Sequence, residues 1–256
     1  MRRKLIVGNW KMHHTVGQSS LLVHRLGKQI KAHRDVEIVL APSLLSLQPV
    51  SLELDHRKFK LAAQNAYHKD EGAYTGEVSF AMLRGLVQYA LVGHSERRTH
   101  FGESLDIVAE KVGAAVRSGI TPIICIGETH TERVAGETRQ VLHDQLTTAL
   151  KHLTAEEVAE VVFAYEPVWA IGTGVTAKPD EINSAINHIR KNLGELYGDR
   201  HAEDVRVLYG AGVEPDYVSG ILSLECGIDG LLVGGASLNY HKFASIVESA
   251  HRMVHS

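Results

Sequence analysis

The chain has 256 residues, of which 44% are hydrophobic and 22% are charged, so it can bury a large core without disulfides or a structural metal. Its formal net charge is -3 and its lysines and arginines are scattered, which argues against a nucleic-acid-binding surface. Its cysteines, Cys125 and Cys226, lack the spacing of a zinc site, and no apolar run is long enough to span a membrane.

The first residues are basic, like the start of a signal peptide, but the apolar stretch that follows runs only from Leu5 to Val7. Such a stretch is far too short for the apolar region of a signal peptide. We therefore expect a cytoplasmic protein that associates with neither membranes nor nucleic acids.

Short apolar segments alternate with longer amphipathic segments along the chain. We expect strands at Lys4–Val7, Glu37–Ala41, Lys60–Ala63, Ala90–Val92, Thr121–Ile126, Val161–Tyr165, Arg206–Tyr209 and Gly230–Val233. We expect helices at Ser19–Ala32, near Leu45–Leu54 and Phe80–Leu86, at Ile107–Val116, from Thr129 towards Leu150, and at Glu181–Leu196, Tyr217–Leu224 and Lys242–His251. Thr129 with Glu132 is typical of a capping box, and Pro179 is typical of a helix start.

These strands are short and continuously apolar, which is typical of parallel strands covered by helices. Repeated β-then-α units form either a closed barrel or an open doubly wound sheet. Eight units in a chain of this length favour an α/β fold with a closed (β/α)8 barrel, eight parallel strands surrounded by helices. No linker divides the chain, so we expect a single catalytic domain over residues 1–256.

In such barrels the chemistry takes place at the carboxyl ends of the strands. Lys11 follows the first strand and could be a fixed cation for an anionic substrate or an ordinary solvated charge. His94 follows the fourth strand among the charges of Glu96, Arg97 and Arg98, a setting that suits an acid–base group. The alternative is a structural ion-pair cluster of Glu96 with Arg97 or Arg98, and the two interpretations are compatible.

Glu166 stands directly after the sixth strand, a poor place for an acid that serves only solubility. Partial desolvation there would raise its pKa towards that of a useful base. The segment that follows contains Gly172, Gly174 and Ala177, and its length and small residues predict a loop that can move.

Glycines follow the last two strands, at Gly210-Ala211-Gly212 and Gly234-Gly235-Ala236-Ser237. Their backbone N–H groups can approach an anion closely, and in barrels these two loops often form a phosphate site. The alternative is a pair of tight turns that need positive φ.

The segment Gly172–Ala177 also matches the GxGxxA form of the dinucleotide-binding fingerprint. A true fingerprint follows a strand immediately and opens a helix, whereas here Glu166–Ile171 intervenes and Pro179 marks the next helix start. We therefore do not expect a nicotinamide site.

Four segments, in this order and spacing, closely resemble the triosephosphate isomerase family, and the resemblance extends from Val7 to Leu238. They are Gly8-Asn9-Trp10-Lys11-Met12, Gly93-His94-Ser95-Glu96-Arg97-Arg98, Ala164-Tyr165-Glu166-Pro167-Val168-Trp169-Ala170-Ile171-Gly172-Thr173-Gly174 and Val233-Gly234-Gly235-Ala236-Ser237-Leu238. The resemblance implies a TIM barrel that interconverts dihydroxyacetone phosphate and D-glyceraldehyde 3-phosphate through an enediolate in glycolysis and gluconeogenesis. It implies no cofactor and no metal.

The resemblance also implies the roles of individual residues. Glu166 would be the carbon base, His94 the neutral electrophile, and Glu96 a supporting acid. Asn9 and Lys11 would bind the substrate and stabilise the enediolate. The phosphate would be held by the backbone N–H groups of Gly172, Gly212, Gly234 and Gly235.

The segment Gly72–Glu77 resembles the family's third loop, which inserts into a neighbouring subunit. The resemblance therefore implies a homodimer in which Thr75 reaches the partner's active site. The alternative is a long polar surface loop.

Two segments depart from the family pattern. Gly212 stands where the family usually has the serine that latches the closed loop, which predicts a less stable closed state. His13-His14 replaces the family's usual Asn-Gly, and we expect these histidines to be solvated rather than to form a pH-sensitive dimer contact.

Three other functions remain open on the sequence. An isomerase of a tetrulose phosphate would use the same base and electrophile. A non-catalytic phosphosugar-binding protein could share the fold, although Lys11, His94 and Glu166 are all present. A nicotinamide enzyme is the third.

Overall fold

The computed structural model describes residues 2–173 and 175–255. Its strands form one closed barrel in sequence order, and every neighbouring pair is parallel. They are β1 (Lys4–Asn9), β2 (Val36–Ala41), β3 (Phe59–Ala63), β4 (Tyr89–Val92), β5 (Thr121–Ile126), β6 (Val162–Tyr165), β7 (Arg206–Tyr209) and β8 (Gly230–Val233). The eight predicted strands and the barrel are confirmed, with ends that differ by at most two residues.

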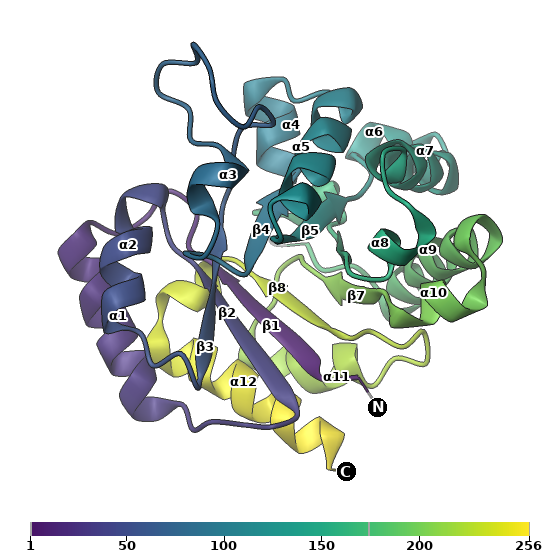
Figure 1. Cartoon of the computed structure of the whole chain (residues 1–256). Helices are drawn as coiled ribbons and strands as arrows, with labels where there is room; N and C mark the ends of the chain where they lie inside the picture. Colours follow the sequence, from purple (N-terminus) through teal and green to yellow (C-terminus); the bar gives the residue numbers. More distant parts are fainter. Residues whose placement is uncertain (1, 174, 256) are drawn as a thin grey trace.

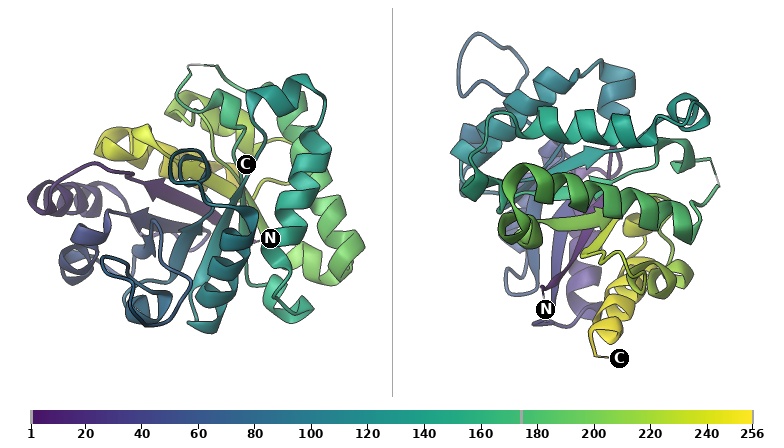
Figure 2. Two further views of the ribbon diagram at one scale, coloured as in Figure 1. Left: turned by 90° about the horizontal axis from the view of Figure 1, so that it is seen from above. Right: turned by 90° about the vertical axis from the view of Figure 1, so that its right-hand side faces the viewer.

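Helices surround the strands, as Figures 1 and 2 show. They are α1 (Val16–Gln29), α2 (Leu44–Glu53), α3 (Phe80–Leu83), α4 (Ser95–Phe101), α5 (Leu105–Arg117), α6 (His130–Val134), α7 (Thr138–Leu150), α8 (Ala155–Val158), α9 (Pro179–Tyr197), α10 (Asp199–Asp204), α11 (Val218–Leu222) and α12 (Tyr240–Val254). The 3-10 turns are η1 (Val168–Ala170), η2 (Pro215–Tyr217) and η3 (Gly235–Leu238). No helix in ranges 2–173 and 175–255 combines the length and hydropathy that crossing a membrane requires.

The single helix predicted from Thr129 towards Leu150 is wrong. The Thr129–Glu132 capping box does open a helix, but α6 ends at Val134 and α7 starts at Thr138. Gly136 lies between them at φ +75°, a left-handed conformation that interrupts a right-handed helix. The start at Pro179 is confirmed.

The core has two layers because successive side chains of a strand point to opposite faces. One layer fills the barrel interior with residues such as Leu5, Val7 and Ile123, and the other packs the outer faces of the strands against the helices. Each fully buried aliphatic side chain contributes about 1.5–3 kcal/mol, so this double core holds the strand ends at fixed positions.

Charged residues close the amino-terminal end of the barrel interior. The Glu37 carboxylate accepts from the Tyr89 hydroxyl at 2.7 Å and from Arg206 Nη1 at 2.9 Å, and it pairs with Lys60 Nζ at 2.5 Å. Burial alone would raise the pKa of Glu37, but these donors lower it from 4.5 to about 2. This carboxylate therefore stays ionised and fully paired across four strands.

Candidate active site

A cavity of ≈ 440 Å³ opens at the carboxyl ends of the strands. Every residue predicted for catalysis or substrate binding lines it: Asn9, Lys11, His94, Glu96, Glu166, Gly172, Gly212, Gly234 and Gly235. Asn9 is the last residue of β1 and the others follow β1, β4, β6, β7 and β8, so the barrel brings together segments that are far apart in the sequence. Thr75 lies outside this cavity, in the exposed loop between β3 and α3.

Glu166 follows β6 directly and is only 2% exposed. Its Oε1 lies 3.1 Å from Nε2 of His94, and its Oε2 accepts from the backbone N–H of Ser95 at 3.4 Å. One glycine makes room for it. A Cβ at Gly127 would lie 1.8 Å from the Glu166 carbonyl oxygen. Gly127 therefore cannot carry a side chain unless the base moves.

The prediction that burial raises the pKa of Glu166 is wrong for this arrangement. Burial does act in that direction, but the adjacent His94, together with Arg98 and the Ser95 N–H, lowers the pKa below its ordinary value. The partner responds in the opposite way: burial would lower the pKa of His94, whereas Glu166 and Glu96 raise it. The two side chains thus stabilise one another as an ion pair when no substrate lies between them.

His94 is the residue that precedes helix α4. Its Nδ1 accepts a hydrogen bond from the backbone N–H of Glu96 at 3.3 Å. An acceptor at Nδ1 places the proton of a neutral imidazole on Nε2, the nitrogen that faces Glu166. The backbone therefore fixes which ring nitrogen can donate into the site.

Lys11 has φ +51°, in the left-handed region that side chains other than glycine rarely adopt. Its N–H donates to Oδ1 of Asn9 at 3.0 Å, and its carbonyl accepts from Nε2 of Gln64 at 2.8 Å. Non-glycine residues in such conformations cost about 1–3 kcal/mol and cluster at functional sites. These contacts hold the Lys11 backbone so that its Nζ reaches Glu96 Oε1 at 2.5 Å.

The predicted pairing of Glu96 with Arg97 or Arg98 is therefore wrong. Arg97 pairs with Glu103, and Arg98 donates to the carbonyl oxygen of Cys125 at 2.9 Å. Neither arginine lines this cavity, and both secure α4 to neighbouring segments, while Glu96 belongs to the site.

Four glycines that line the cavity have backbone N–H groups with no acceptor among residues 2–173 and 175–255. Within the described residues, no hydrogen bond to a protein acceptor uses the backbone N–H of Gly172, Gly212, Gly234 or Gly235. Gly172 and Gly212 have φ +71° and +55°. Free N–H groups that line a cavity are the donors that a phosphate group requires.

Glu128 was not predicted from the sequence, and it lies outside the catalytic cavity, beside the segment that follows Glu166. Its buried carboxylate accepts from Nε1 of Trp169 at 2.7 Å and from the Tyr165 hydroxyl at 3.2 Å, and Arg133 stacks 3.8 Å above the Trp169 ring. These contacts hold the first part of the segment that follows Glu166. The rule that selected Glu166, an acid just after an apolar strand, would also have selected Glu128.

Gly172, Thr173, Val175 and Thr176 in the rest of that segment are exposed to solvent, whereas Ala177 is buried. Thr173 Oγ1 donates to the Trp169 carbonyl at 3.1 Å. Gly174, predicted with Gly172 and Ala177 to belong to the stiff ends of a loop that can move, lies outside the described residues. The fingerprint-like residues 172–177 follow a 3-10 turn rather than a strand, and α9 begins only at Pro179, as expected from the sequence.

The two histidines after Lys11 differ. His13 is exposed, as predicted, but His14 is half-buried and packs edge-on against the Trp10 ring, with a centroid separation of 5.9 Å. Burial lowers the pKa of His14, so the prediction of a solvated side chain is wrong for this residue.

A buried acid–imidazole pair, a nearby lysine and free N–H groups at the carboxyl end of a (β/α)8 barrel define a class of enzyme that performs acid–base chemistry on small anionic substrates. The chain matches the family model described as triosephosphate isomerase over residues 4–250. The chain belongs to the triosephosphate isomerase family and is an isomerase.

Curated relatives agree with this assignment, and each of the following is named triosephosphate isomerase. The relative from Dehalococcoides mccartyi is 43% identical over 250 residues, which cover 98% of this chain and 97% of that protein. The relative from Caldanaerobacter subterraneus subsp. tengcongensis is 44% identical over 248 residues, covering 96% and 99%. The relative from Citrifermentans bemidjiense is 45% identical over 248 residues, covering 96% and 98%.

Proposed function

We propose that this chain interconverts dihydroxyacetone phosphate and D-glyceraldehyde 3-phosphate through an enediolate, without a cofactor. The observation that carries the proposal is the 3.1 Å contact between Glu166 and His94 inside a cavity that is also lined by four glycines, whose N–H groups have no acceptor among the described residues. A carbon acid with a phosphate tail needs both features: a base beside the carbonyl and an anion site at a fixed distance from it.

In this mechanism Glu166 removes a proton from the carbon next to the carbonyl. The carboxylate is ionised in the empty site because His94 lowers its pKa. A substrate that enters between the two side chains separates Glu166 from its cationic partner. The carboxylate is then buried without that partner, which raises its affinity for a proton at the moment when it must accept one.

His94 polarises the carbonyl and moves protons between the two oxygens. Once the substrate takes the place of Glu166, the main influence that raises the pKa of His94 is gone. The Glu96 N–H at Nδ1 then favours a neutral ring that donates from Nε2. A neutral imidazole is a weak acid whose acidity is better matched to that of an enediol oxygen, so its Nε2 proton can be donated to one substrate oxygen and recovered from the other.

Lys11 and Asn9 stabilise the enediolate charge where it develops. The Lys11 ammonium can exchange Glu96 for the substrate, because both the lysine and the glutamate side chains line the cavity. Asn9 Oδ1 is occupied by the Lys11 N–H, which leaves the amide NH₂ of Asn9 to donate to substrate oxygen. Glu96 is thus the supporting acid that positions Lys11 before the substrate arrives.

The phosphate binds to the N–H groups of Gly172, Gly212, Gly234 and Gly235. Three of these glycines belong to the rigid ends after β7 and β8, whereas Gly172 belongs to the segment after Glu166. Binding would therefore recruit this segment over the cavity, with the Glu128–Trp169 contact as its fixed end. Closure excludes water, which protects the enediolate phosphate from elimination.

A homodimer completes the proposal. A second cavity of ≈ 350 Å³ adjoins the first and shares Asn9, Lys11, His94 and Glu96 with it. Its rim includes Met12, which is 96% exposed, and Phe101, which is 67% exposed. The β3–α3 loop, which carries Thr75, projects from the barrel in Figure 1. This loop of one copy would cover the apolar rim of the other, and Thr75 would approach Lys11 there. The cytoplasmic location stays a prediction from the sequence.

The test is a coupled isomerase assay on the purified protein, with triose and tetrulose phosphates as substrates and with Glu166→Asp beside the wild type. We expect high turnover of the triose phosphates and a loss of about 100-fold or more in Glu166→Asp, because retracting the carboxylate by one methylene misplaces the base. Faster turnover of the tetrulose phosphate would replace the substrate assignment. Unaltered activity in Glu166→Asp would overturn the role of the base.

A further inference from the structure

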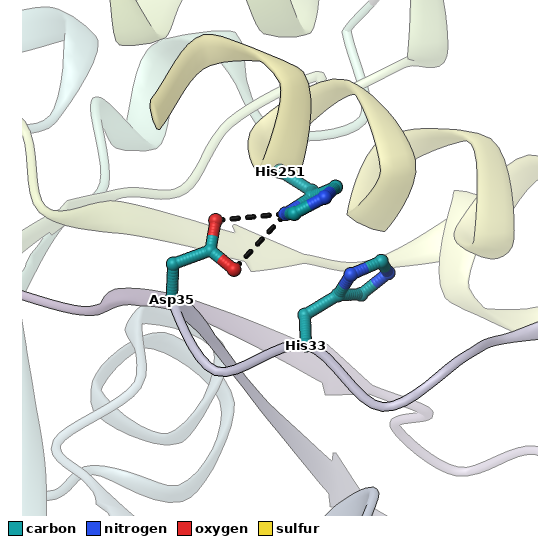
Figure 3. A group of neighbouring side chains, drawn as sticks. All are labelled: His33, Asp35 and His251. Carbon is teal, nitrogen blue, oxygen red and sulfur yellow. Dashed lines mark hydrogen bonds and ion pairs between the residues drawn. The ribbon is translucent and has the colours of Figure 1, made fainter. Parts of the chain in front are cut away.

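A cluster of histidines and acids lies at the opposite end of the barrel from the active site. His33 and Asp35 belong to the segment between α1 and β2, and His251 belongs to the last turn of α12 (Figure 3). One potential ligand atom from each of the three side chains lies within 4.8 Å of the others. None of these residues contributes to the catalytic cavity.

Asp35 is the centre of the cluster. Its oxygens lie 3.0 and 2.8 Å from Nδ1 of His251, and Oδ2 lies 3.3 Å from Nε2 of His255. Four ligands around Zn²⁺ at 2.0–2.1 Å are separated from one another by about 3.3 Å. The spacing of Asp35 and His255 already matches this value, and one ligand atom each of His33, Asp35 and His251 lies within 4.8 Å of the others.

His33 is held in the orientation of a metal ligand. Its ring stacks on the ring of His251 at a centroid separation of 4.0 Å, and its Nε2 lies 3.0 Å from Glu248 Oε1. A carboxylate that accepts from one ring nitrogen keeps the proton there and leaves the other nitrogen basic, the usual arrangement of a histidine bound to zinc. Glu248 therefore orients the His33 ring so that Nδ1 can serve as the metal ligand.

We propose that His33, Asp35, His251 and His255 form a Zn²⁺-binding site that joins the end of α12 to the segment before β2, with Glu248 as the residue that orients His33. Imidazole nitrogen with one carboxylate suits zinc better than magnesium or calcium, which prefer oxygen ligands. The two pairs of ligands are more than 200 residues apart in the sequence, so they do not form a recognisable metal-binding motif. A bound ion would stabilise the folded protein because the unfolded chain does not hold the ligands together.

The experiment uses the full chain without a histidine tag, freed of metal with a chelator and then titrated with Zn²⁺ in a calorimeter. The variant His251→Asn keeps a donor that can reach Asp35 but lacks the ring. The matched control is His152→Asn, which removes the ring of another histidine–acid pair, His152 with Glu110 at 3.5 Å. We expect the wild type and His152→Asn to bind one equivalent of zinc more than His251→Asn does. Zn²⁺ should also raise the melting temperature of the wild type and of His152→Asn, but not that of His251→Asn.

Two further measurements keep the proposal testable if His251→Asn folds poorly. Glu248→Gln should weaken zinc binding by about 10- to 100-fold, as changes to partners of metal-bound histidines do. Co²⁺ in place of Zn²⁺ should give the intense visible absorption of a tetrahedral site, and this absorption should be lost in His255→Ala. Equal zinc stoichiometry in the wild type and His251→Asn, unchanged affinity in Glu248→Gln, or a weak six-coordinate cobalt spectrum would overturn it.

Discussion

Each end of the barrel contains a buried carboxylate, but the two are treated in opposite ways. Glu37 at the amino-terminal end is surrounded by Lys60, Tyr89 and Arg206, which all belong to strands. Glu166 at the carboxyl end follows its strand and meets His94, one backbone N–H and an open cavity. The carboxylate of Glu37 has fixed hydrogen-bond and ion-pair partners, whereas the carboxylate of Glu166 can exchange its partners for a substrate.

This difference assigns stability to the amino-terminal end of the barrel and catalysis to the carboxyl end. The partners of Glu37 are fixed by the strand register and cannot leave without opening the barrel. The side-chain partners of Glu166 and of the Lys11 ammonium, His94 and Glu96, lie on the segment after β4 and line the cavity, so a substrate can displace them. The predictions below test this division from the largest expected effect to the smallest.

The largest effect is expected at the carboxyl end, in His94→Gln. Glutamine can still donate a hydrogen bond but cannot shuttle a proton, so we expect kcat to fall by about 10²- to 10⁴-fold with little change in the free energy of unfolding. Steady-state kinetics and urea unfolding measure the two quantities. The control is His24→Gln on the exposed face of α1, which should leave both unchanged. A kcat equal to that of the wild type would contradict the role of His94.

The opposite result, a loss of stability with unchanged turnover, is expected at the amino-terminal end in Glu37→Gln. Removing the carboxylate leaves Arg206 half-buried without its anion, which should lower the free energy of unfolding by roughly 3 kcal/mol. Turnover of the folded enzyme should not change. Urea unfolding compares this variant with Glu160→Gln, an exposed control. If Glu37→Gln lowered kcat as well, the two ends would be coupled and the division would fail.

The stabilisation by Glu37 should also depend on pH. Its folded pKa, about 2, lies below the ordinary 4.5, so its stabilisation is complete above pH 4.5 and is lost as the pH falls towards 2. The full depression corresponds to about 3 kcal/mol. The stability difference between the wild type and Glu37→Gln should therefore shrink across this window. A difference that stays constant from pH 5 to pH 3 would show that shape rather than charge accounts for it.

The smallest effect is expected at Gly212. A serine hydroxyl there would add about one hydrogen bond to the closed loop, about 1 kcal/mol, and should reduce phosphate elimination per turnover by about fivefold. The position has φ +55°, so any side chain introduces strain. Gly212→Ala carries the same strain without the hydroxyl and is therefore the matched control. Equal elimination in the serine and alanine variants would show that the missing latch has no consequence.

The strands and the residues that line the site could be predicted from the sequence because both depend on local patterns. Continuous apolar runs identify buried parallel strands, and the barrel places the polar residues that follow them at one end. Short elements such as α4 could not be predicted in this way. Its sequence, Ser95–Phe101, is mostly polar, and the helix is set by the His94 cap and by contacts with neighbouring segments.

Partnerships between distant residues were harder to predict. The local sequence does not show that Glu96 pairs with Lys11 rather than with the adjacent Arg97. This pairing depends on the left-handed backbone of Lys11 and on the ion pair that Arg97 forms with Glu103. The pKa of Glu166 was mispredicted for the same reason. Burial follows from its place after a strand, but the contact with His94 depends on how β4 and β6 end across the barrel.

Both chain ends lie on the amino-terminal side of the barrel, whereas the β3–α3 loop projects from the other side (Figures 1 and 2). Immobilising the enzyme on a solid support through either terminus would therefore turn the mouth of the catalytic cavity towards the solution. Attachment through an exposed residue of the β3–α3 loop, such as Thr75, would turn the same mouth towards the support. The orientation of the barrel thus determines which attachment site on the chain leaves the catalytic cavity accessible to substrate on a solid support.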